Sequence, residues 1–203
     1  MKYIKMFNES INRSDIDAIC KKYNIKNYTI NNDGSIDVNG NVDLSGKNLN
    51  ILPLNFRSIN GFFDCSNNKL TSLEGSPENI DGFFNCNDNN LTSLKNSPKR
   101  INKDFWCGGN KIKNIDYFPK YYKNLCIDNN PIGKILELFI HFDILLDKLP
   151  TEDKELISEF IEREIIQQDI LLINRLIEFL YDINKSYPKE YIYNLLKDDY
   201  TIR

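Results

Sequence analysis

The residues of this chain with the greatest capacity for chemistry are five cysteines and a single histidine. Three of the cysteines, Cys65, Cys86 and Cys107, recur at an interval of 21 positions. Regularly spaced thiols could bind a metal or form disulfides, but the chain has no Cys-x-x-Cys pair, and His141 lies outside the region that holds them. On adjacent strands of a sheet such side chains stand about 4.8 Å apart, which is ordinary packing. We therefore predict buried, reduced thiols, with no metal and no cofactor.

Nothing else in the sequence forms a catalytic group of residues. His141 lies in an apolar stretch, and no nucleophile is identified that it could activate. A Gly-rich phosphate loop is also absent, and the Gly108-Gly109 pair is explained by a backbone turn. We therefore expect no catalytic residues and a protein that is not an enzyme. The alternative is an enzyme or effector whose active site lies in the C-terminal segment.

The three cysteines belong to an internal repeat that runs from about Asn41 to Ile132. The segment 61–73, GFFDCSNNKLTSL, returns as GFFNCNDNNLTSL at 82–94 and more loosely as DFWCGGNKIKNI at 104–115. A fixed period in this range is typical of a solenoid, in which each coil packs only on its neighbours.

The repeat predicts which side chains enter the core. Phe63 and Cys65 are two residues apart, so they share one face of a strand and point inward. The Asn of each unit can turn inward and bond backbone groups of neighbouring coils. Gly, Ser and Pro77 in the rest of the coil favour an extended side without a helix.

These units fill the closing part of the pattern L-x-x-L-x-L-x-x-N/C-x-L, with Phe63, Cys65, Asn68 and Leu70 as one example. The chain therefore resembles the leucine-rich repeat superfamily. Its short units look most like those of bacteriophage and giant-virus leucine-rich repeat proteins and of bacterial effectors. The resemblance implies an α/β solenoid with a curved parallel β-sheet and an extended convex side. The first copy departs from the pattern, because Lys47 stands where the Asn belongs. Some of those effectors carry a cysteine-based ubiquitin ligase, but no cysteine follows Cys126 here.

The flanking segments are expected to close the ends of the solenoid, which divides the chain into residues 1–40, 41–132 and 133–203. In the first, Ser14 is a predicted cap for a helix that ends near Tyr23, and strands at 28–30 and 36–38 form a hairpin around Asn32-Asp33-Gly34. The last segment is predicted to be a helical cap, with helices that begin near residues 131, 151, 169 and 188.

Alternate strand residues point outward, so the repeat also predicts the concave surface. Its prominent side chains are three aromatic residues, with carboxylates and an amide beside them: Phe62, Phe83, Trp106, Asp43, Asp64, Asn85, Asp104 and Asp128. Exposed aromatic clusters are unusual unless a partner covers them, and Trp is enriched at binding hot spots. The alternative is that these rings pack against the chain's own helices or only satisfy cross-strand pairing.

Charge and hydropathy limit the classes of partner that we expect. The net charge is −3, which gives no general reason to expect nucleic acid, and no apolar run approaches a membrane span. The first twelve residues lack the apolar core of a signal peptide. We therefore expect a cytoplasmic protein, in the host cytoplasm if it is viral. Its function would be that of an adaptor or antagonist that binds a basic protein partner on the concave face, with its oligomeric state left open.

Overall fold

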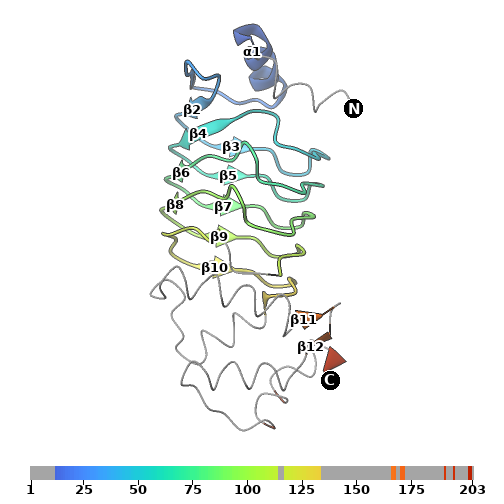
Figure 1. Cartoon of the computed structure of the whole chain (residues 1–203). Coiled ribbons are helices and arrows are strands. Elements are labelled where there is room, and N and C mark those ends of the chain that lie inside the picture. Colours follow the sequence, from blue (N-terminus) through green and yellow to red (C-terminus); the bar gives the residue numbers. More distant parts are fainter. Residues whose placement is uncertain are drawn as a thin grey trace. The chain divides into compact units, whose positions relative to one another are not determined.

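The computed structural model describes residues 12–113 and 117–133, together with residues 166–167, 170–171, 190, 194 and 201–202. Contacts group the chain into two units. The first comprises Met1–Asn110 and Tyr117–Ile127, and the second comprises Lys111–Asp116 and Asp128–Arg203. In the first unit the chain winds into a β-solenoid whose successive strands stack as parallel ladders (Figure 1). The repeat predicted from the sequence is therefore a structural repeat.

Each coil contributes to two sheets, which we call sheet A and sheet B. In sheet A the order is β1 (Tyr28–Ile30), β2 (Ile36–Val38), β4 (Phe56–Ile59), β6 (Asn79–Ile80) and β8 (Arg100–Ile101). In sheet B it is β3 (Val42–Asp43), β5 (Phe63–Asp64), β7 (Phe84–Asn85), β9 (Phe105–Trp106) and β10 (Leu125–Cys126). Within sheets A and B all pairs are parallel except β1 with β2, and Phe63 pairs with Phe84 and Phe84 with Phe105.

Sheet A adds a feature that the sequence analysis did not contain. The side of the coil before residues 61, 82 and 103 was predicted to be extended and not helical. It is extended, and it also forms parallel ladders. Ile59, Ile80 and Ile101 supply its inward column, and each is buried. The equal spacing of these three isoleucines was the available signal. Two-residue strands are too short to show the alternation by which strands are usually identified.

The core confirms the inward register of sheet B. Phe63, Phe84 and Phe105 are 0% exposed, and their ring centroids lie 5.8 and 5.7 Å apart from coil to coil. Cys65, Cys86 and Cys107 form a second buried column beside them, and none of the three takes part in a disulfide. Burial of one such Phe side chain contributes roughly 1.5–3 kcal/mol.

A column of asparagines joins the coils at the turn after sheet B. The Nδ2 of Asn89 donates to the carbonyl oxygens of Cys65, Cys86 and Asn87 at 3.0–3.1 Å, and its Oδ1 accepts from the Leu70 amide at 2.9 Å. Asn68 and Asn110 repeat this pattern with their own coils. In the second unit, Asn130 Oδ1 accepts from the Ile112 amide at 3.0 Å. The predicted role of the asparagines is confirmed.

The same turn requires a left-handed backbone at the residue before each Asn. That position is held by Asn67, Asp88 and Gly109, with φ between 53° and 62°. In the first coil the equivalent residue is Gly46, with φ 62°, although Lys47 follows it in place of an Asn. Asn, Asp and Gly are the residues that tolerate this conformation. Gly82 serves a different purpose at the corner between the sheets, because a Cβ there would stand 2.6 Å from the Gly61 carbonyl oxygen. The coils can approach closely only without that side chain.

The N-terminal elements form, with one correction. Helix α1 spans Arg13–Lys22, and its N-cap is Asn12, whose side chain accepts from the Asp15 amide at 3.0 Å. Ser14 was predicted as the cap, but it lies inside the helix and its hydroxyl donates to the Asn12 side chain. The hairpin of β1 and β2 is present, and β2 continues sheet A by pairing with β4. The Tyr28 hydroxyl donates to Asp17 at 2.6 Å and so links α1 to the hairpin.

In the second unit the structure describes short strands, one of which lies where a helix was predicted. Strand β11 (Ile166–Gln167) pairs antiparallel with β12 (Ile170–Leu171), and β12 pairs parallel with β13 (Thr201–Ile202). The prediction of a helix from residue 169 is therefore wrong at Ile170 and Leu171, because a short run of apolar residues fits a strand as well as a helix. Glu190 and Asn194 are helical. Gly133, in the helix predicted from residue 131, is also helical. The rest of that helix and the helix predicted from residue 151 lie outside the described residues, and the capping roles of both flanking segments stay predictions.

The cysteines provide a test of this register. Burial raises the pKa of the Cys65 and Cys86 thiols well above the ordinary range and that of Cys20 to about 11, so few reactive thiolates form there. Cys20 belongs to the buried face of α1 and is 0% exposed, so a bulky reagent does not reach it in the folded protein. We predict that a bulky thiol reagent labels Cys126 rapidly in the native protein and the other thiols only after denaturation.

The control for that experiment is Cys126→Ser, which should remove the fast phase. Fast labelling of Cys65, Cys86 or Cys107 in the folded protein would show that the register is wrong.

Candidate functional site

The candidate site lies on the outer face of sheet B, where alternate residues point away from the core. Phe62 and Phe83 stand just before β5 and β7, and Trp106 ends β9. All three side chains are partly exposed, whereas the adjacent Phe63, Phe84 and Phe105 are buried. This alternation follows from the pleat of the strands.

The three outer rings form one continuous stack. The ring centroids of Phe62 and Phe83 lie 4.7 Å apart with an interplanar angle of 4°, and those of Phe83 and Trp106 lie 4.8 Å apart at 27°. Phe83 therefore has a ring on each side, from the preceding and the following coil. Because the ring faces contact one another, the stack presents mainly ring edges to solvent. A partner would meet a ridge of edges and not a flat aromatic platform.

Polar side chains form a second row beside the rings. Asp64 accepts from the Ser66 amide at 2.9 Å and from the Asn85 side-chain amide at 3.0 Å. Asp43 accepts from the amide and hydroxyl of Ser45, and these bonds lower the pKa of its carboxyl group. The carboxylate of Asp43 is therefore ionised at neutral pH, and the hydrogen bonds hold this row in a defined orientation.

The structure brings most of the predicted residues together. Asp104 is partly exposed and accepts from the Asn124 side chain at 2.7 Å, one coil further along. Asp128 is exposed but belongs to the second unit, so its position is described only within that unit. The set Phe62, Phe83, Trp106, Asp43, Asp64, Asn85 and Asp104 thus lies on one sheet face.

Alternation along the strands would also place Ser66 and Gly108 outside, but both are buried, and Ser66 is only 4% exposed. The backbone already bends into the asparagine turn at these residues, since the Ser66 carbonyl oxygen accepts from both Gly46 and Asn68. Cys126 pairs with Trp106, which places it in the outward row, while Ile127 is the buried residue of that coil.

This face carries aromatic rings, carboxylates and side-chain amides. Within the described residues, no group of three or more His, Cys, Asp or Glu side chains could hold a metal ion. His141 lies outside the described residues. The helices that the structure describes include none long and apolar enough to cross a membrane.

One group of surface residues was missed by the sequence analysis. Lys and Arg side chains gather with exposed tyrosines at the C-terminal end of sheet A, around Arg100 and Tyr121. The signal was a local excess of charge, because residues 95–123 contain eight Lys and Arg against two Asp and no Glu. The net charge of the whole chain conceals that excess.

Comparison of the chain with protein-family models, with curated proteins and with solved structures found no match. The geometry of the described residues is therefore the basis for inferring function.

The two neighbouring aromatic residues of β9 should differ sharply in their effect on stability. Phe105→Ala leaves a cavity in the core, which we expect to lower the free energy of unfolding by about 3–5 kcal/mol. Trp106→Ala removes one partly exposed member of the outer stack, at an expected cost of about 1 kcal/mol. Urea or thermal unfolding of both variants checks the difference. Equal destabilisation would mean that Trp106 supports the core and is not available for binding.

Proposed function

We propose that this protein is a leucine-rich repeat interaction module that binds a protein partner on the outer face of sheet B. The single observation that carries the proposal is the partly exposed stack of Phe62, Phe83 and Trp106. A folded protein gains more from burying such rings than from leaving them in contact with water. Aromatic residues, Trp above all, supply the largest single contributions to protein interfaces.

Membership of the leucine-rich repeat class is supported by the asparagine column. In that class the Asn of the pattern stands at the turn after the strand, and Asn68, Asn89 and Asn110 occupy that turn here and bond the backbone of two coils. The short, nearly identical units favour the viral and effector branch of the class. The protein would then act as an adaptor or antagonist that captures a host protein without modifying it.

The charge beside the stack favours a basic partner. Asp43, Asp64 and Asp104 flank the rings, and a carboxylate has enough lone pairs to accept a further bond from Lys or Arg of a partner. Such charges mainly increase the association rate and the selectivity, whereas the rings supply most of the affinity. The hydrogen bonds within the polar row reduce the ordering cost of binding, since the side chains are already held in place.

The proposal predicts a specific loss of binding. A protein partner captured from a host extract with the native chain should bind the Trp106→Ala variant at least about 30-fold more weakly than it binds the native chain. That ratio corresponds to about 2 kcal/mol, the contribution of a buried interfacial Trp. Phe62→Ala should act in the same direction. Calorimetric titration of the purified partner against each variant gives the dissociation constants.

Glu74→Ala is the matched control, because Glu74 is an exposed residue outside sheet B, in the stretch between β5 and β6. Its affinity should equal that of the native chain. Unchanged affinity of both Trp106→Ala and Phe62→Ala would place the binding surface elsewhere.

A further inference from the structure

A cluster of cations occupies the C-terminal end of sheet A and the corner that follows it. We call it the basic margin, and it consists of Lys99, Arg100, Lys103, Lys120 and Lys123, all exposed. The Lys120 amide donates to the Lys99 carbonyl oxygen at 3.0 Å, and the Lys123 amide donates to that of Lys103 at 2.8 Å. The cations therefore stand in register on adjacent coils. Coils approach to about 4.8 Å, so like charges are held close together.

Few carboxylates balance these charges. Lys99 forms an ion pair with Glu78 at 3.0 Å, but both side chains are more than half exposed. Arg100 donates to the Asn102 side chain at 2.9 Å and so uses a neutral acceptor. In the part of the chain that the structure describes, no ion pair is recorded for Lys103, Lys120 or Lys123. A surface that holds uncompensated like charges attracts an anionic partner.

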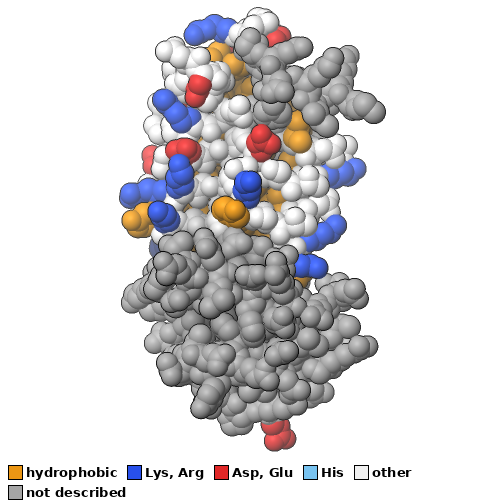
Figure 2. Space-filling model, viewed as in Figure 1, with side chains coloured by type: hydrophobic (Ala, Val, Ile, Leu, Met, Phe, Trp, Pro, Cys, Tyr) orange, Lys and Arg blue, Asp and Glu red, His pale blue; other side chains and the backbone are white. Residues whose placement is uncertain are grey.

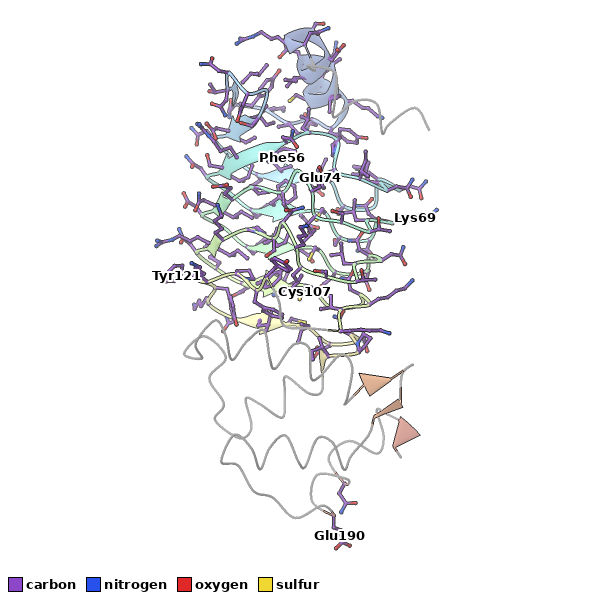
Figure 3. The ribbon with its side chains drawn as sticks, in the orientation of Figure 1. Phe56, Lys69, Glu74, Cys107, Tyr121 and Glu190 are labelled. Carbon is purple, nitrogen blue, oxygen red and sulfur yellow. The ribbon has the colours of Figure 1, made fainter. Side chains whose placement is uncertain are left out.

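Exposed tyrosines accompany the cations. Tyr117, Tyr121 and Tyr122 are 58%, 62% and 37% exposed, and they are the exposed large hydrophobic side chains of the described residues. Tyr121 pairs with Arg100 across adjacent coils, and the guanidinium lies 5.5 Å from its ring centroid. Figure 3 shows Tyr121 projecting from the edge of the coils, and Figure 2 shows Lys and Arg side chains beside exposed hydrophobic atoms at that edge.

We infer that the basic margin binds single-stranded nucleic acid without sequence preference. Cations in register neutralise successive phosphates, and exposed tyrosine rings stack on unpaired bases, which is the combination that such surfaces use. An acidic protein partner fits less well, because Lys is depleted at protein interfaces. The net charge of −3 gave no reason to expect nucleic acid, and the inference revises that expectation. The segment after Gly133 alone carries 15 Asp and Glu against nine Lys and Arg, so the net charge of the whole chain does not describe the basic margin.

This margin is distinct from the aromatic stack on sheet B. The rings of that stack contact one another face to face and have carboxylates beside them, so neither bases nor phosphates are favoured there. Tyr121, in contrast, lies beside cations and is largely exposed. The inference does not depend on the proposed protein partner, because the two rest on different residues. An experiment can therefore contradict either one and leave the other standing.

Fluorescence anisotropy with labelled 15-mers of deoxythymidine and of uridine tests the inference on the full chain. We expect a dissociation constant in the micromolar range at 50 mM salt, and equal binding of both probes because phosphates and base faces are common to them. Neutralisation of five phosphates predicts an affinity about 100-fold weaker at 200 mM salt.

Two variants locate the surface, and a third provides the control. The double variant Lys120→Glu/Lys123→Glu should weaken binding by at least about tenfold, and Tyr121→Ala by about fivefold or more through lost stacking. Lys47→Glu/Lys69→Glu reverses two exposed cations elsewhere on the coils and should leave binding unchanged, with Lys69 on the opposite edge in Figure 3.

Three results would overturn the inference. The first is no binding of either probe at 50 mM salt. The second is an equal loss in the control variant, which would indicate attraction to net charge alone. The third is a pair of observations: poly-glutamate displaces the labelled probes at equal charge concentration, and Tyr121→Ala binds the probes as tightly as the native chain. Together they would identify a surface for acidic polypeptides.

Discussion

A buried turn in a solenoid leaves backbone amides and carbonyl oxygens with no strand to bond them, and this chain resolves that constraint with asparagine. The side chain of Asn89 alone satisfies one amide and three carbonyl oxygens, from residues as far apart as Cys65 and Asn87. Unpaired buried groups of this kind would each cost about 1–3 kcal/mol. The bonds also join consecutive coils, so the column sets the height and the rotation of each coil relative to the next.

The rotation that the asparagine column gives each coil determines which residues lie on each face of sheet B. With every coil held in the same rotation, Phe63, Phe84 and Phe105 must stack inside, and Phe62, Phe83 and Trp106 must lie outside. A slip of one residue would exchange the two sets, because side chains alternate along a strand. The candidate binding surface is therefore a consequence of the core register. The left-handed residues, such as Asp88 and Gly109, are part of the same turn and allow it to close.

The sequence predicted the features that repeat and missed those that depend on a single copy or on length. A period of 21 was enough to place Cys65 and Asn68 in the core, since each copy repeats the same information. Sheet A was missed because its strands at Asn79–Ile80 and Arg100–Ile101 are too short to alternate visibly. Asn12 and Ser14 are both good helix caps, so only the backbone distinguishes them. Alternation alone would place Ser66 outside, but the strand has already ended before it and its side chain is buried. The basic margin was missed because the net charge of the whole chain adds this local positive charge to the negative charge of other segments.

The most direct test of the central role of asparagine compares two neighbouring asparagines in the same coil. Asn89 is 7% exposed and makes the four bonds described, whereas the Asn90 side chain is partly exposed and makes none of them. Free energies of unfolding for Asn89→Ala and Asn90→Ala can be measured by urea denaturation. We predict a loss of about 2–4 kcal/mol for Asn89→Ala and less than about 0.5 kcal/mol for Asn90→Ala. Equal stability of the two variants would contradict the account, because the turns would then be held together without the asparagine column.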